Sequence, residues 1–544
     1  MKHVKTTRRS FLSTTAKGMG VLGLSSSLID SIVLQILNKA CAQTLTKEIY
    51  YVHVSLAGGL PRWQFDLPLK PLSNSTFRAA KFGTVIEGSP GNYSVQYVTK
   101  PYTISNTQKV NLAPVWFMNS SGKKFTDLLP NMAMIRGVDM EINSHPISNG
   151  RQVAPNIGGY SISGVTADAA NLPLPGVLQN GTIGDSASNV FRSTRGLAGL
   201  SFNHKTANPV GTLLRAFKPL NPAAEFTKSD WQSAREQVQT RFDEYALAMG
   251  VHSSSLAEAY SSAEELVSKG IINLQDDYPA LKDKYRDLIS DAVFPGSGAL
   301  SAYFPNTITV DASSRSFQLV QNTNIQTSNL WDVLGNSTFP EAMAEGFAVA
   351  ELMIKNNLSS SYVISVPGWE KLRIGGTVSS PTLVTISNDH HFVGQYPETL
   401  LTTLQYRALL SCLCEFTERL GDKFNKTVIH ISSEWNRSPR ADGTGSDHGV
   451  TGSNVSLISG MIQGPVVIGN IRADSGLPLY PGTWGVAAPW RFDDNLTRPF
   501  VVTDVTRTIT GMLGVRDVVN NGYPLLKINS GGKWVAVRNE AQNV

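Results

Sequence analysis

Short apolar runs bounded by turn residues alternate along the chain with longer segments of helical periodicity. Short runs rich in β-branched and aromatic side chains are typical of buried strands. Runs of this kind predict strands at 50–56, 132–138, 361–366, 383–387 and 428–432, and helical patterns lie at 341–356 and 399–421. Because parallel strands need crossover connections, this order predicts an α/β fold with a mainly parallel sheet flanked by helices.

Residues 227–292 carry a different pattern. Trp231, Val238, Phe242 and Tyr245 recur there at helical spacing among charged side chains. An apolar stripe on an otherwise charged helix is typical of packing against a larger core. We therefore predict a helical insertion beside the sheet, either purely structural or placed as a roof over a site.

Residues 1–42 have the pattern of an export signal rather than of a folded element. Arg8-Arg9 is followed by an apolar stretch and by Ala40-Cys41-Ala42, an order typical of a twin-arginine signal. Asp30 and nearby serines interrupt the apolar stretch, which argues against the alternative of a basic N-terminus before a membrane anchor. We expect a periplasmic or secreted protein whose mature α/β domain is 43–544, with no stable membrane span.

Charge and cysteine content narrow the classes of function. Of 47 basic and 42 acidic residues, six basic and one acidic lie in 1–42, so the mature chain is balanced. A balanced chain has no electrostatic reason to bind nucleic acid or a membrane surface. Cys412 and Cys414 stand two positions apart in a predicted helix and face different sides of it. They are expected to be buried thiols rather than a disulfide or a metal site.

Residues that carry chemistry gather just after the strand predicted at 428–432. Glu434 and Arg437 follow it, and Asp447-His448-Gly449 closes a glycine-rich loop. A carboxylate beside an imidazole supplies the oxygen and nitrogen ligands that Zn²⁺ and similar divalent ions take. In open α/β sheets, ligands bind outside the carboxyl ends of strands, which is where this loop falls. The alternative is that Glu434 and Arg437 form a structural ion pair beneath the loop.

A second group follows the strand predicted at 383–387. Asp389 and His391 belong to the sequence Asn-Asp-His-His at 388–391 and can face the same cleft as the first group. Alone this is weak evidence, because a loop histidine is more often solvated or hydrogen-bonded within the protein. Together the two loops predict a divalent metal site, with zinc the expected ion. The expected ligands are Asp389, His391, Asp447 and His448.

Ser144 and His145, after the strand predicted at 132–138, are the third group of candidates. A serine hydroxyl beside a metal ion can act as a nucleophile, because the cation favours its alkoxide. Ser144 can equally belong to a turn or a helix cap. In the first group, Arg437 can hold an anionic oxygen through two hydrogen bonds, and Glu434 can orient that guanidinium or bind a metal.

A resemblance to a known family rests mainly on the block after 428–432. It reads Ser-Glu-Trp-Asn-Arg-Ser-Pro-Arg from Ser433 to Arg440, and Asp447-His448-Gly449 follows. This resembles the secreted bacterial family called domain of unknown function 1501, which usually has Phe-Gly where this chain has Trp435-Asn436. Weaker similarities span roughly residues 48 to 520 and lie at Gly58-Gly59 with Phe65-Asp66, at Ser144-His145 and at Thr503-Asp504.

The resemblance implies an alkaline-phosphatase-like sheet, because that family resembles the alkaline phosphatase and sulfatase superfamily. It also implies an exported metal-dependent hydrolase that takes a small anionic substrate, a phosphate or sulfate ester. In the superfamily, Asp-and-His pairs from two loops hold two metal ions. The family's second loop is Asp-x-His with a following Gln, which Asp389, His391 and Gln395 match.

The chain departs from the family at the residues before that loop. The family usually has Gly-Trp-Asp-x-His directly after a strand, whereas this chain has Gly368-Trp369-Glu370. Either Glu370 replaces the aspartate, or residues 371–387 are an insertion before the motif. The insertion is favoured, because only Asp389-His390-His391 supplies imidazoles.

Two further departures concern the metal ligands. The superfamily's first strand normally ends near a ligand aspartate, whereas Gly58-Gly59 is followed by no carboxylate before Asp66. Its hydrolases also have a late histidine ligand, and His448 is the last histidine here. Both departures favour the alternative of a catalytically degenerate exported binding or assembly protein on the same fold, so the sequence leaves open whether the chain is an enzyme.

Overall fold

The computed structural model describes most of the chain between residues 47 and 538. The longer described segments are 47–56, 58–67, 100–105, 108–156, 159–170, 176–179, 190–197, 199–202, 277–293, 341–376, 381–391, 395–439, 445–474 and 483–538, with residues 172 and 393 and short strands between 307 and 329. The predicted signal at 1–42 lies outside the described residues, as does the part of the predicted helical insertion from 227 to 276.

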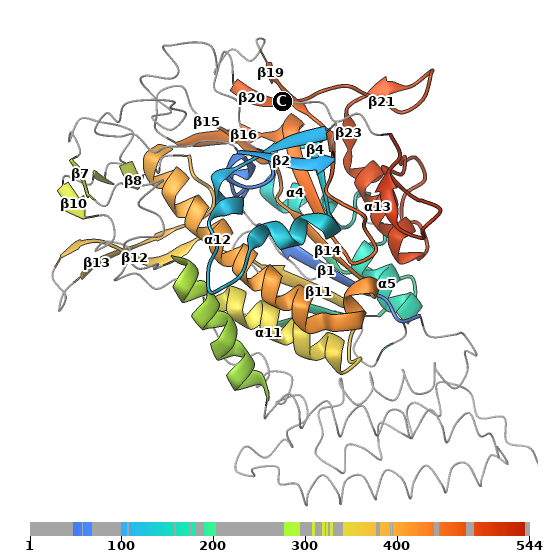
Figure 1. Ribbon diagram of the computed structural model, residues 1–544, viewed down its shortest axis with the longest axis horizontal. Coiled ribbons are helices and arrows are strands. Elements are labelled where there is room, and N and C mark those ends of the chain that lie inside the picture. The colour runs from blue at the N-terminus through green and yellow to red at the C-terminus, as the bar shows by residue number, and fades with distance from the viewer. Residues whose placement is uncertain are drawn as a thin grey trace, which may run out of the picture.

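A nine-stranded sheet forms the centre of the fold (Figure 1). Its order is β18 (Val466–Gly469), β4 (Met132–Asp139), β17 (Ser453–Ile458), β14 (Thr427–Ser432), β1 (Tyr50–Ser55), β11 (Ser361–Ser365), β5 (Val177–Gln179) and β6 (Leu200–Phe202), with β23 (Phe500–Val501) paired to β4. Within this sheet, β17 runs antiparallel to β14 and β4, and the other pairs are parallel. The sheet is therefore mixed but mostly parallel, which confirms the α/β prediction.

Helices cover both faces of the sheet. Side chains alternate along each strand, so the buried strands present apolar side chains to both faces, and each face packs against helices. Tyr50, Val52 and Val54 belong to the apolar core shared with α11 (Glu341–Lys355) and α12 (Gln395–Leu420). Tyr51, on the other face of β1, belongs to the core shared with α5 (Ile162–Ala170) and α13 (Val502–Leu513). Figure 1 shows α11 and α12 crossing in front of the strands.

The run predicted as a strand at 383–387 is a strand, but it does not belong to the central sheet. β13 (Pro381–Ile386) pairs with β12 (Trp369–Gly376) in a two-stranded antiparallel hairpin after β11. The prediction placed it wrongly because an apolar β-branched run specifies extended backbone but does not specify the partner strand. At the base of the hairpin a Cβ on Gly368 would lie 2.6 Å from the Ser387 Cα, so the chain leaves and returns at one point.

The predicted helices at 341–356 and 399–421 are α11 and α12. Residues 277–293 are also helical, in agreement with the last part of the predicted insertion, and this helix packs on both of them. Tyr285 donates a 2.8 Å hydrogen bond to Glu351 of α11, and Arg407 of α12 donates a 2.6 Å bond to the Ala292 carbonyl. Cys412 and Cys414 are buried free thiols, as expected. No helix among the described residues is long and apolar enough to cross a bilayer.

A buried ion pair anchors the segment that follows β1. Arg62 and Asp66 are both fully buried, and Arg62 Nε donates a 3.0 Å hydrogen bond to Asp66 Oδ1. Ser456 of β17 donates to the other carboxylate oxygen at 2.5 Å, and Arg136 of β4 donates to the Asp66 carbonyl at 2.7 Å. The segment after β1 is therefore tied to the antiparallel part of the sheet through groups that have no access to water.

Polar side chains also fill the space between the sheet and α4 (His145–Arg151). His53 and His430 are register partners on β1 and β14, and both are buried. His53 Nε2 lies 2.9 Å from the Ser432 hydroxyl, which in turn donates to Gln152 at the end of α4. Burial lowers the pKa of His53 to about 4 and the pKa of His430 well below its ordinary value. Both imidazoles are neutral at pH 7.

We predict that Asp66→Asn lowers the free energy of unfolding by about 3–5 kcal/mol, because it leaves the buried Arg62 guanidinium without its counter-charge. Urea denaturation followed by circular dichroism measures the change. The matched control is Asp494→Asn, which removes the exposed Arg491–Asp494 pair and should change stability by less than about 1 kcal/mol. Equal effects of the two substitutions would contradict the structural importance of the buried pair.

We predict that acid destabilises the protein through His53. Its folded-state pKa lies below the ordinary value of 6.5, so the stability it contributes is present above pH 6.5 and is lost as pH falls towards about 4. His53→Gln takes up no proton and should lose less stability over that range, by on the order of 3 kcal/mol. Urea midpoints at pH 7, 6, 5 and 4.5 test this, and parallel pH profiles for the two proteins would refute it.

Candidate active site

Loops from several strands meet at one edge of the sheet. β1, β11, β14 and β4 all end at this edge, since β17 is antiparallel to both β14 and β4. Gly58-Gly59 follows β1, α4 begins at His145 after β4, and residues 388–391 follow the β12–β13 hairpin. Glu434 follows β14, and Asp447 and His448 lie on β16 (Ser446–Gly449), which pairs with β15 (Asn436–Pro439).

The base of the site is a buried carboxylate held by backbone amides. Gly58 N–H donates to both Glu434 carboxylate oxygens at 2.8 and 3.0 Å, and Gly59 N–H donates to one of them at 2.8 Å. Both glycines have positive φ, 97° and 75°, which is strained for other residues. A Cβ on Gly59 would also lie 2.8 Å from Trp435 Nε1. The glycine pair thus allows both the turn and the close approach to the Glu434 loop.

Three imidazoles direct their Nε2 atoms at the Asp389 carboxylate. His391 Nε2 lies 3.1 Å from Asp389 Oδ1, and His448 Nε2 lies 3.6 Å from the same oxygen. His145 Nε2 lies 3.6 Å from the other oxygen, Oδ2. His391 Nε2 and His448 Nε2 are 3.0 Å apart. The structure therefore brings Asp389, His391 and His448 together as the sequence predicts, and adds His145 to them.

The opposite nitrogen of each ring faces an oxygen. His145 Nδ1 lies 3.5 Å from Glu434, His391 Nδ1 lies 3.2 Å from Asp447, and His448 Nδ1 lies 2.6 Å from the Asn143 side-chain oxygen. A metal-binding histidine typically donates its second ring N–H to such an oxygen, which fixes the tautomer and leaves the other nitrogen to bind the ion. In this arrangement Asp447 supports His391 rather than joining the central group.

The donor set fits a divalent metal ion. Ligand atoms of His145, Asp389 and His448 lie within 4.8 Å of one another, close enough to surround one ion. Imidazole and carboxylate are the ligands of catalytic zinc sites. His391 Nε2, in contact with two of these residues, can complete the group. The donors come from α4, the 388–391 loop and β16, so the fold rather than a local motif assembles them.

The charges of the group depend on one another. Burial lowers the pKa of His145, but the carboxylates of Asp389 and Glu434 outweigh burial and raise it to about 9. Hydrogen bonding to Asp389 and Asp447 raises the pKa of His391, whereas burial and the charge of Arg437 lower that of His448. Burial raises the pKa of Asp389, but its histidine partners hold it far below its ordinary range. Asp389 is therefore a carboxylate at any physiological pH.

Arg437 has a different place from the anion contact expected of it. Its side chain is buried and bonds to the Asp389 carboxylate. It also donates to the carbonyls of Gly58 and Gly59 at 2.8 and 2.9 Å. Its donors therefore serve the protein itself, and it positions Asp389. The alternative of a direct Glu434–Arg437 pair does not describe the contacts either, because the two side chains bind the amides and carbonyls of the same two glycines.

Trp435 forms an aromatic wall against the histidines. Its ring centroid lies 4.1 Å from that of His448 and 4.5 Å from that of His145. The side chain is fully buried. Packing against a rigid indole limits the rotation of both imidazoles, so it complements the hydrogen bond at His448 Nδ1.

Ser144 stands at the N-cap position of α4, directly before His145. Its hydroxyl makes no capping hydrogen bond to that helix. It is partly exposed and directly precedes His145 of the candidate metal group. Ser144 therefore occupies the helix-cap position, and its carbonyl accepts the Ser148 N–H at 2.8 Å, but its hydroxyl is not used for capping.

Asp66, the nearest acidic residue after Gly58-Gly59, does not replace the missing early aspartate. Its carboxylate is bound by Arg62 and Ser456 in the core. The hairpin of β12 and β13, in contrast, occupies the residues expected as an insertion at 371–387. Asn388 donates to the Val366 carbonyl at 2.9 Å, so the 388–391 loop starts beside the end of β11, as it would if the hairpin were absent.

The role of His145 in the central group was not predicted from the sequence, which suggested only a nucleophile and its neighbour. Asn143 and Trp435 were also missed as supports for His448. The available signal was the position of Asn143 to His145 after a strand that ends at the same edge as the other loops. The order of the strands in the sheet, which places the end of β4 near the other loops, could not be read from the sequence.

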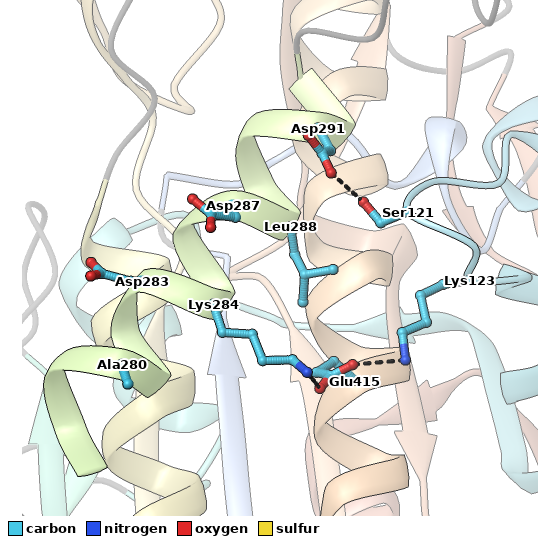
Figure 2. A pocket seen from close by; sticks show the side chains of 9 residues that line it. All are labelled: Ser121, Lys123, Ala280, Asp283, Lys284, Asp287, Leu288, Asp291 and Glu415. Carbon is cyan, nitrogen blue, oxygen red and sulfur yellow. Dashed lines mark hydrogen bonds and ion pairs between the residues drawn. The ribbon is translucent and has the colours of Figure 1, made fainter. Parts of the chain in front are cut away.

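A separate cavity of about 520 Å³ lies away from this site (Figure 2). It lies between helix 277–293 and α12, and its lining carries two lysines and four acidic side chains. Glu415 accepts ion pairs from Lys123 and Lys284 at 2.7 and 2.6 Å, and Ser121 donates to Asp291 at 2.8 Å. We assign it no chemistry, because these contacts join the two helices to each other and to the segment at Ser121 and Lys123.

Comparison of the chain with models of known families, with curated proteins and with solved structures finds no match. The site geometry is therefore the main evidence from which a function can be argued.

Proposed function

We propose that this chain is a metal-dependent hydrolase of phosphate or sulfate esters with an alkaline-phosphatase-like fold. The observation that supports this best is the orientation of the three imidazoles. Their Nε2 atoms converge on Asp389, while Glu434, Asp447 and Asn143 face the Nδ1 atoms. A cluster of partly buried histidines that served stability alone would have no need of this common orientation.

In the proposed reaction, water is added across the bond between phosphorus or sulfur and the ester oxygen. A bound divalent ion, zinc by our expectation, would stabilise the negative charge that develops during this displacement. His145, Asp389, His391 and His448 would hold it. Arg437 would keep Asp389 in place, and Glu434 would keep the Nδ1 proton on His145.

Ser144 is the proposed nucleophile, because its hydroxyl is not used as a helix cap and adjoins His145. Its oxygen would form the bond to phosphorus or sulfur as the alcohol leaves with a proton. Water would then cleave the resulting serine ester and release phosphate or sulfate. This two-step route divides one difficult displacement into two.

We expect protein purified without chelator to retain a divalent metal and to cleave an aryl phosphate or an aryl sulfate. His448→Ala should abolish turnover and metal retention, because a ligand is lost. Asp447→Asn should weaken metal affinity by about 10–100-fold, as expected for a residue that orients a ligand. Elemental analysis and release of the coloured phenol measure these effects.

The control for these variants is Asp494→Asn, an exposed acidic residue that we place outside the site. It should retain metal and turnover. Wild-type protein that retains no metal and cleaves neither ester class would contradict the hydrolase. That result would favour the alternative, an exported binding or assembly protein whose site has lost catalysis.

The proposed location is the periplasm or the exterior, reached through the twin-arginine pattern at residues 8–9. We predict that replacing Arg8 and Arg9 by Lys keeps the protein in the cytoplasm, because the arginine pair is recognised as an address rather than as positive charge alone. Cell fractionation and immunoblotting measure this. The control replaces Lys2 and Lys5 by Arg, which should leave export unchanged. Normal export of the Arg8/Arg9 variant would refute the signal.

A further inference from the structure

His390 lies between two residues of the candidate metal group, but its own side chain is buried behind the loop. His390 Nδ1 lies 3.5 Å from Glu398 Oε1, and neither side chain is exposed to solvent. Glu398 stands in the first turn of α12, where the helix dipole favours a negative charge. A buried carboxylate and a buried imidazole therefore face each other beneath the site.

Glu398 also contacts the second loop of the site. The Ser446 hydroxyl donates to Glu398 Oε1, and the Ser446 N–H donates to the His390 carbonyl at 3.0 Å. Gly445, with φ of 146°, lies so close that a Cβ would be 2.4 Å from the His390 carbonyl oxygen. Asp389 and His391 adjoin His390, while Asp447 and His448 follow Ser446. One carboxylate thus joins the two loops that carry these four residues.

Stability alone does not account for this arrangement. Removing a carboxylate from water costs several kcal/mol, and apolar residues of similar size often pack as well or better. Glu398 Oε2 and both ring nitrogens of His390 have no hydrogen-bond partner among the described residues, so the desolvation cost is only partly offset. Among the residues that the structure describes, the contacts of Glu398 are with His390 and Ser446 of the two loops of the site.

We propose that Glu398, with His390, is a positioning residue that clamps the 388–391 loop to β16 and so fixes the geometry of the metal-binding group. This rests on the function proposed above. The clamp acts from α12, and it is distinct from the oxygens that face the imidazole Nδ1 atoms. It sets the distance between the loops, whereas those oxygens set the orientation of each ring.

Zinc affinity tests the link to the metal group. In competition with a chromophoric chelator, Glu398→Ala should bind zinc about 10–100-fold more weakly than wild type. Glu398→Gln should lose less affinity, because its amide oxygen still accepts the Ser446 hydroxyl. The matched control is Glu415→Gln, another buried glutamate of α12 about 25 Å along the helix. Glu415 binds two lysines (Figure 2), so this variant should lose stability but keep zinc affinity.

Amide hydrogen exchange tests the clamp without metal. The Ser446 N–H should exchange at least about tenfold faster in metal-free Glu398→Ala than in wild type. In Glu415→Gln the exchange rate of this N–H should equal that of wild type. If the alanine variant fails to fold, the Ser446 exchange rate of Glu398→Gln is compared with that of wild type instead. Unchanged Ser446 exchange would overturn the clamp. Faster exchange with unchanged zinc affinity would overturn its link to the metal group, whereas wild-type protein that binds no zinc would contradict the proposed function instead.

Discussion

The Glu434 carboxylate is fully buried between the chain segments that follow β1 and β14, and it accepts the N–H groups of Gly58 and Gly59. Arg437, from the same loop, binds the carbonyl groups of those two glycines. The N–H groups and the carbonyl groups of both glycines are thus bound by side chains of one short segment, which contains Glu434 and Arg437. Glu434 then faces His145 and Arg437 binds Asp389, so two of the converging side chains depend on this junction. It is strong because charged partners bind backbone groups in a region without water.

Much of the fold follows from apolar patterning, because burial on one or both faces of an element leaves a period in the sequence. The strands at β1, β4, β11 and β14 and the helices α11 and α12 were predictable for that reason. The pairing of strands was not, since register and neighbour depend on contacts far apart in the chain. β13 illustrates this, because its apolar run fits a central strand but pairs only with β12.

The candidate site was predictable where chemistry is encoded by adjacent residues. Asp389, His391 and His448 could be grouped because each follows a predicted strand and carries ligand chemistry. The sequence did not predict which of these residues form the centre of the site and which only support the others. Asp447 and Arg437 support other side chains, while His145 joins the centre, and only the three-dimensional arrangement distinguishes these roles. Asp66 does not stand in for the missing early aspartate, because its partner Arg62, four residues earlier, holds it in the core.

The β12–β13 hairpin has a consequence for how this protein can change. Its two ends meet at Gly368 and Ser387, and Gln405 binds both the Pro367 carbonyl and Asn388 at that point. The loop that follows is thereby held independently of the hairpin's length. Segments of this kind accept insertion and deletion with little effect on the domain that bears them. The hairpin is thus a module on which evolution, or an engineer, can build a recognition surface without rebuilding the candidate site.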